Sequence, residues 1–249
     1  MTIQNKQSST ALKNIPALIE DHKFVEAIPQ IENARSRPGS DLSKIDAARL
    51  YYFWSICLYE IGQYRLAIIK AKVAQFLCRE LTDHKLYADI KVSYGYSLFQ
   101  LGRMKQSLEE FNEAYASYRR AGDSASLLYP LNRMSHIHYL KGDLRRCQEM
   151  LQECVENARQ YHSTPQVLID TRNMIRVLMA TGEFGEVSKA LDSISDLLSE
   201  PKDYYYSEFL AGLRHTQIGE YEAATSTIDS ARVGFESLSR ERDIVVCLE

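Results

Sequence analysis

Histidine and cysteine are the residues of this chain best suited to catalysis or metal binding, but their spacing supports neither. The six histidines are scattered, and no carboxylate pair, nucleophile motif or glycine-rich phosphate loop accompanies them. The cysteines form no C-x-x-C pair and have no histidine at ligand spacing; they are Cys57, Cys78, Cys147, Cys154 and Cys247. Cys147 and Cys154 are seven residues apart, on one face of a helix, where cysteine behaves as a small hydrophobe. We therefore expect buried structural thiols, no metal or cofactor, and no enzymatic activity in this segment.

A turn motif recurs along the chain. A glycine is followed two positions later by a large apolar residue at Gly62, Gly102, Gly142, Gly182 and Gly219. Successive glycines are 40, 40, 40 and 37 residues apart. Forty residues before Gly62 stands His22, with Phe24 in the apolar position, which predicts a sixth, weaker copy. A fixed period between about 20 and 50 residues is the signature of a repeat array.

Each repeat is predicted to contain two helices separated by the glycine turn. The segment before Gly62, LYYFWSICLYEI, and the segment after it, RLAIIKAKVAQFLCREL, both place apolar residues at i, i+3, i+4 and i+7. No segment sustains the alternation of a β-strand. Small residues such as Ser55 and Ala67 recur seven before and five after most turns, where antiparallel helices approach to about 8–10 Å. The predicted fold class is all-α.

Glycine turns flanked by small residues, with Ala67 and Ala74 seven apart on the second helix, resemble the tetratricopeptide repeat (TPR) family. The resemblance covers about 220 of the 249 residues and is weakest around Gly182. It implies a superhelical solenoid of about six antiparallel helix pairs. The repeat of about 40 residues is longer than the usual 34, as in family members found in signalling scaffolds and bacterial transcriptional regulators.

The whole chain, residues 1–249, is expected to form a single TPR-like repeat domain. Its approximate repeats are 8–40, 41–82, 83–122, 123–162, 163–199 and 200–239. Residues 240–249 are expected to begin a further, truncated repeat, because the chain stops within the segment DIVVCLE. We therefore expect one part of a longer protein, whose apolar C-terminal end would be open to self-association.

Composition excludes several classes of protein. With 45% hydrophobic and 25% charged residues, the chain is neither disordered nor fibrous. The N-terminus lacks a hydrophobic signal core and the apolar runs are short, so neither export nor membrane insertion is expected, and a cytoplasmic location is favoured. A formal charge of -3 gives no reason to expect nucleic-acid binding by this segment.

A ligand-binding groove is expected along the first helices of the repeats, because the resemblance implies that these helices line the concave face. The face lies ten, six and three residues before each turn. We predict these groove residues: Tyr52, Tyr59, Tyr96, Phe99, Asn132, His136, Tyr139, Arg172, Arg176 and Phe209. Aromatic side chains would anchor a ligand, Asn132 would bracket a peptide backbone, and Arg172 with Arg176 would pair with a carboxylate. The alternative is that long helices bury many of these tyrosines between repeats.

These features favour a non-catalytic scaffold that binds a protein or peptide in the groove. Because the long-repeat resemblance includes transcriptional regulators, the scaffold is expected to be the regulatory or sensory region of a larger cytoplasmic protein, such as a bacterial transcription regulator. The alternative is a structural oligomerisation module with no separate ligand.

Overall fold

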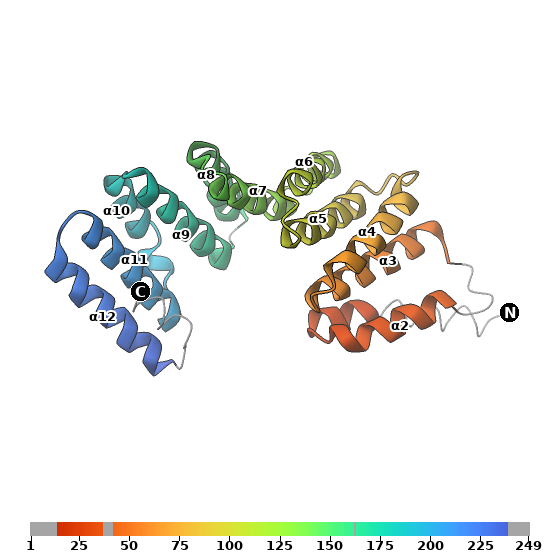
Figure 1. The fold of residues 1–249 in the computed structure, drawn as a ribbon, viewed down its shortest axis with the longest axis horizontal. Helices are drawn as coiled ribbons and strands as arrows, with labels where there is room; N and C mark the ends of the chain where they lie inside the picture. Colours follow the sequence, from red (N-terminus) through yellow and green to blue (C-terminus); the bar gives the residue numbers. More distant parts are fainter. Residues whose placement is uncertain (1–13, 37–41, 162, 239–249) are drawn as a thin grey trace. The chain divides into compact units, whose positions relative to one another are not determined.

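The computed structural model describes residues 14–36, 42–161 and 163–238. Every regular element in these ranges is helical (Figure 1), so the predicted all-α fold class is confirmed. Residues 14–20 form a helix that precedes the numbered elements. The elements that follow are α2 (Phe24–Ser36), α3 (Lys44–Glu60), α4 (Tyr64–Cys78), α5 (His84–Gln100), α6 (Met104–Ala121), η1 (Ala125–Leu127), α7 (Leu128–Leu140), α8 (Leu144–Gln160), α9 (Thr164–Thr181), α10 (Phe184–Asp192), η2 (Ser195–Leu197), α11 (Pro201–Gln217) and α12 (Tyr221–Ser237).

The turns between paired helices share one backbone conformation. The five predicted turn glycines have φ angles between +72° and +84°, in the left-handed region that side chains disfavour. At Gly102 the amide donates to the Phe99 carbonyl and the next amide donates to the Leu98 carbonyl, each across 2.9 Å. These bonds satisfy carbonyls at the end of the first helix.

His22 adopts the same turn as the glycines. Its φ is +59°, the only positive value at a non-glycine residue in the described ranges. Its amide donates to the Ile19 carbonyl across 3.1 Å, and the next amide donates to the Leu18 carbonyl across 2.8 Å. His22 therefore occupies the position that the 40-residue spacing predicts for it.

The small residues flanking the turns are buried where paired helices meet. Ser55 and Ala67 are fully buried, and their counterparts in the next repeat, Gly95 and Ser107, are buried as well. A Cβ atom on Gly95 would lie 2.7 Å from the ring of Phe111, and the Ser107 hydroxyl donates to the Gly95 carbonyl across 2.8 Å. Side chains this small allow the helices of a pair to approach closely.

The second helix of the fifth repeat is shorter than its counterparts. α10 has 9 residues, whereas α8 and α12 each have 17. Ser193 and Ser195 donate their hydroxyls to carbonyls three residues earlier. Such local hydrogen bonds compete with the backbone hydrogen bonds of an α-helix. The chain then continues as η2, yet Ile194 is still fully buried.

The helices are grouped into two compact units, Met1–Pro130 and Leu131–Glu249. In the first unit, Ile31, Leu50 and Trp54 belong to one apolar core. In the second, Leu151, Ile175 and Leu210 belong to another. A single domain over residues 1–249 stays a prediction. The proposed start of a further repeat at 240–249, and Cys247 within it, lie outside the described residues.

In the described ranges, no helix has the combination of length and apolar character needed to cross a membrane.

Candidate ligand-binding pocket

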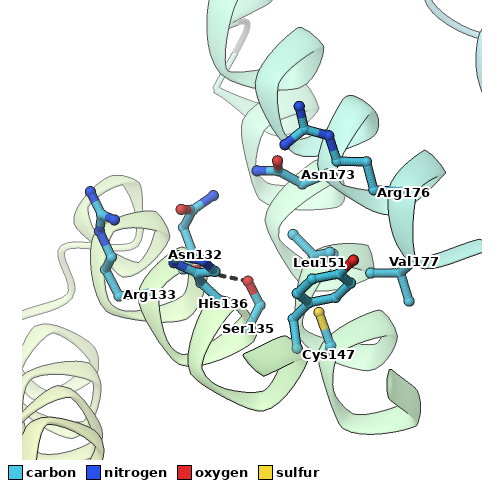
Figure 2. A pocket seen from close by; sticks show the side chains of 10 residues that line it. Asn132, Arg133, Ser135, His136, Cys147, Leu151, Asn173, Arg176 and Val177 are labelled. Carbon is cyan, nitrogen blue, oxygen red and sulfur yellow. Dashed lines mark hydrogen bonds between the residues drawn. The ribbon is translucent and has the colours of Figure 1, made fainter. Parts of the chain in front are cut away.

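A pocket of about 270 Å³ opens in the second unit between α7, α8 and α9. Figure 2 shows Asn132 and His136 of α7 on one side, Asn173 and Arg176 of α9 across from them, and Leu151 of α8 lower down between the two helices. The full lining is Asn132, Arg133, Ser135, His136, Tyr139, Cys147, Leu151, Asn173, Arg176 and Val177. α7 and α9 are first helices of their repeats, so the pocket lies where the groove is predicted.

Helical spacing places the lining residues on one face of each helix. On α7, Asn132, His136 and Tyr139 are four and three residues apart, and on α9 Asn173 precedes Arg176 by three. Residues at these separations lie one above another. The pocket thus brings together four of the predicted groove residues: Asn132, His136, Tyr139 and Arg176.

Asn132 is held in place by a buried carboxylate. Its Nδ2 donates to Oδ1 of Asp170 across 2.7 Å, and Gln166 Nε2 donates to Oδ2 of the same carboxylate across 2.9 Å. Asp170 is fully buried, and this burial raises the pKa of its carboxyl group despite both hydrogen bonds. The backbone carbonyl of Asn132 also accepts the Ser135 hydroxyl at 2.7 Å, the dashed line in Figure 2. Asn132 is therefore oriented before any ligand arrives.

The charge of the lining favours an anionic or hydrogen-bonding ligand. Arg133 and Arg176 contribute cations, and none of the lining residues is acidic. Partial burial, together with the nearby Arg133, lowers the pKa of His136 below its usual range, so the imidazole is neutral at pH 7. The Asn173 side chain makes no hydrogen bond to any described residue, which leaves its amide donors and acceptor for a ligand.

Arg172, predicted to act with Arg176, has a different environment. Its Nη1 lies 3.0 Å from Asp203 Oδ1, and its Nη2 donates to the Asp203 carbonyl oxygen across 2.9 Å. The guanidinium also lies 4.9 Å from the ring centre of Tyr206. With side chains only 13% and 14% exposed, Arg172 and Asp203 form a largely desolvated pair that joins α9 to α11. Arg176 is exposed and donates to the Tyr206 hydroxyl.

The remaining predicted groove residues pack against neighbouring side chains. In the first unit, the Tyr59 and Tyr96 rings are 5.9 Å apart, and Tyr96 lies 5.4 Å from Phe111. Burial raises the pKa of Tyr52 well above its usual range, and Phe99 is half-buried. In the second unit, buried Phe209 packs with Ala231 and Phe235.

Six of the ten lining residues lie outside the predicted groove set, and the two of these that add a charge or a side-chain amide are Arg133 and Asn173. Both stand nine residues before their turn glycines, one helical turn from the predicted position at six. The equivalent positions in other repeats hold Phe53, Ser93 and Leu210. The signal that could have found them is the change to Arg and Asn in these two repeats alone.

The cysteines and two of the histidines have structural environments. Cys57, Cys78, Cys147 and Cys154 are buried free thiols, as predicted, and burial raises the pKa of the first three to about 11. Such thiols are protonated at neutral pH and poor nucleophiles. His138 and His215 each place Nδ1 beside the acidic residue that follows the turn glycine, at 3.1 Å from Asp143 and 2.5 Å from Glu220. Among the described residues, no cluster of three or more His, Cys, Asp or Glu side chains could hold a metal ion.

This arrangement of helix pairs is a TPR-type repeat fold, as solved structures confirm. The chain is similar to the TPR-like repeats of a kinesin light chain from Podospora anserina, with a TM-score of 0.69 and 13% identity over 80% of this chain and 99% of that chain. It is similar to the apo form of RapI, with a TM-score of 0.77 and 12% identity over 93% of this chain and 84% of that one. A third similar structure is the Rap conjugation gene regulator of plasmid pLS20 in complex with the Phr* peptide, with a TM-score of 0.64 and 16% identity over 95% and 65% of the two chains. The sequence matches no family model, and no curated protein is significantly similar to it.

Proposed function

We propose that this chain is a non-catalytic peptide-binding scaffold, serving as the regulatory or sensory region of a larger cytoplasmic protein such as a bacterial transcription regulator. The observation that carries the proposal is the pocket between α7, α8 and α9, in which two asparagines and two arginines surround an apolar floor. The pLS20 regulator supports it, because that protein has a similar fold and is bound to a peptide.

The size of the pocket fits part of a peptide. Its volume of about 270 Å³ is at or below the lower end of small-molecule sites, which span roughly 300–1,000 Å³. One or two residues of a peptide would fill it, and the flanking residues would lie along α7 and α9.

The polar groups of the pocket match an extended backbone. A peptide backbone offers alternating N–H donors and C=O acceptors, and the Asn173 amide supplies both complementary groups. Asn132 Nδ2 already donates to Asp170, so the side-chain oxygen of Asn132 is the atom that would accept a backbone N–H. An oriented group loses little conformational entropy when a ligand binds, which favours affinity.

The cations define the side chain that the pocket would prefer. With Arg133 and Arg176 in a lining that contains no acid, an aspartate, a glutamate or a C-terminal carboxylate is the complementary group. Arg176 is the residue to test, because it is exposed, whereas Arg172 is committed to Asp203.

The experiment is a selection from a phage-displayed random peptide library. Enriched peptides are synthesised with a fluorescent label, and their binding to the wild-type chain, to Arg176→Glu and to Arg145→Glu is measured by fluorescence anisotropy. Arg145 is the matched control, because its side chain is 92% exposed and lies outside the pocket. We expect affinity to fall at least about tenfold in Arg176→Glu, since a like charge replaces the ion pair, and to be unchanged in Arg145→Glu.

Two results would contradict the proposal. Failure to enrich any peptide would remove the support for a peptide scaffold, and equal affinity for Arg176→Glu and wild type would move the site away from the pocket. Concentration-dependent association in sedimentation velocity, without peptide binding, would favour the alternative of an oligomerisation module.

A further inference from the structure

The outer face of α4 carries a row of exposed apolar side chains. Leu66, Ile69 and Phe76 are 47%, 54% and 68% exposed, and we call these three residues the α4 row. Their separations of three and seven residues place them along one side of the helix, over a length of about 15 Å at 1.5 Å per residue. The opposite side of α4 is buried through Ala67, Ala71 and other apolar residues.

The other repeats show that the TPR-like fold does not require apolar residues at these positions. The α4 row stands four, seven and fourteen residues after Gly62. The same positions hold Gln106, Glu109 and Ala116 in α6, and Arg146, Glu149 and Glu156 in α8. These second helices pack with polar or small residues outward, so the α4 row has a cause other than the packing of its own repeat.

The exposed charges beside the α4 row are mostly positive; the exception is Glu80, just past the end of α4, whose carboxylate is paired with Lys44. Arg65, Lys72 and Arg79 are exposed, and their spacing interleaves them with Ile69 and Phe76 on the same side. Helix α4 itself contains no aspartate or glutamate. Cations that alternate with apolar side chains complement a helix in which acids alternate with apolar residues.

We propose that the α4 row is a docking surface for an acidic amphipathic helix of a partner protein. A single helix fits, because the surface is one row wide and about 15 Å long, or roughly three helical turns. A second copy of this chain would bring the cations of two α4 helices together, and the repulsion disfavours that arrangement. The surface is separate from the pocket in the second unit, so its function does not depend on the peptide-binding proposal.

The test is a selection from a phage-displayed library of helical peptides with randomised outer faces. The full chain is the bait, and the counter-selection uses Leu66→Gln/Ile69→Glu/Phe76→Ala. This triple variant takes the residues of α6, all of which favour helix at least as well as those they replace, so circular dichroism and the melting temperature should match wild type. We expect enriched peptides to be acidic, with apolar residues at i, i+3 or i+4, and i+7.

Affinity of synthetic enriched peptides should respond to both features of the surface. We expect a loss of at least about tenfold in the triple variant, because the central apolar contacts of an interface carry most of its energy. In Arg65→Glu/Lys72→Glu the loss should be several-fold, and the wild-type affinity should weaken as salt rises. Arg176→Glu should bind as wild type does. If the triple variant has a lower melting temperature than wild type, Arg65→Glu/Lys72→Glu tests peptide binding to the same surface with the α4 row intact.

Three outcomes would overturn the proposal. Enrichment of no peptide, or of neutral or basic ones, would remove the acidic helix as the occupant. Equal affinity in wild type and both variants would remove the surface. Binding of the wild-type chain, but not of the triple variant, to phosphatidylserine-containing vesicles in the absence of peptide binding would assign the surface to an anionic membrane.

Discussion

Asn132 donates its side-chain amide to the buried carboxylate of Asp170 across 2.7 Å, joining α7 to α9 beside the pocket. The residues are 38 apart in the sequence and come from first helices of successive repeats. Asp170 receives a second amide from Gln166, and no lysine or arginine among the described residues pairs with it. A carboxylate satisfied by neutral amides alone bears a desolvation cost that the amides only partly offset.

This environment predicts a pH dependence of stability. Because burial raises the pKa of Asp170 above its ordinary 3.8 in the folded state, the folded chain holds this proton to higher pH than the unfolded chain does. Protonation of Asp170 therefore contributes stability below pH 3.8, and the contribution is lost as pH rises from there through the raised folded pKa. Relative to Asp170→Asn, the wild-type chain should lose stability across that window. Urea unfolding at a series of pH values measures the difference between the two curves.

Removing the hydrogen-bond donor Asn132 should extend the pH-dependent loss of stability to higher pH. The hydrogen bond from Asn132 favours the ionised form of Asp170, so Asn132→Ala should raise the carboxyl pKa further and carry the loss of stability to higher pH. A difference between wild type and Asp170→Asn that does not change with pH would show that Asp170 ionises as it does in the unfolded chain.

Gly95→Ala should destabilise the first unit. The added Cβ would lie 2.7 Å from Cε1 of Phe111, so the buried Phe111 ring or one helix of the pair must shift, at a cost of about 1–3 kcal/mol in the free energy of unfolding. Gly185→Ala in α10 is the control: it meets nothing within 4 Å and should be neutral or stabilising by up to about 1 kcal/mol. Phe111→Leu should recover part of the loss in the Gly95→Ala background, and urea denaturation of all four chains checks this. Equal stabilities for the two alanine variants would refute the close approach.

His22→Gly should stabilise the N-terminal hairpin. A side chain at φ +59° costs about 1 kcal/mol that glycine does not incur, although part of this gain is lost to the greater freedom of glycine in the unfolded chain. The reciprocal change, Gly102→His, places a side chain at φ +72° and should lower stability by a similar amount. Thermal melts of both variants are the measurement. If His22→Gly is less stable than wild type, the contact between His22 and Phe24, whose ring centres are 5.7 Å apart, outweighs the cost of a side chain at a positive φ angle.

Arg172 and Arg176 should differ in their effects on folding. Arg172→Met leaves Asp203 largely buried without its cation, which should cost about 3 kcal/mol. Arg176→Met removes an exposed side chain and should change the free energy of unfolding by less than about 0.5 kcal/mol. The double variant Arg172→Met/Asp203→Leu should recover most of the loss, because no unpaired charge remains buried. Similar stabilities for the two single variants, measured by urea denaturation, would show that the Arg172–Asp203 pair contributes little to folding.

The helix pairs could be predicted from the sequence because their determinants are local and recur. Each hairpin is marked by a turn glycine, by a small residue seven positions before it and by another small residue five positions after it. The 40-residue period repeats this local pattern along the chain. Even His22, which breaks the glycine pattern, was placed correctly by counting. The face that holds Asn132, His136, Tyr139 and Arg176 follows from helical spacing in the same way.

Side-chain partners, by contrast, were decided by the tertiary structure alone. Arg172 and Arg176 lie four residues apart on α9 and look alike in the sequence, yet Arg172 is bound to Asp203 of α11, 31 residues away, while Arg176 borders the pocket. Likewise, nothing near Asn132 in the sequence indicates that Asp170 will orient it. Periodicity gives the direction in which a side chain leaves its helix, but the residue it meets depends on how far apart the neighbouring helices stand and which polar group the next helix places opposite it.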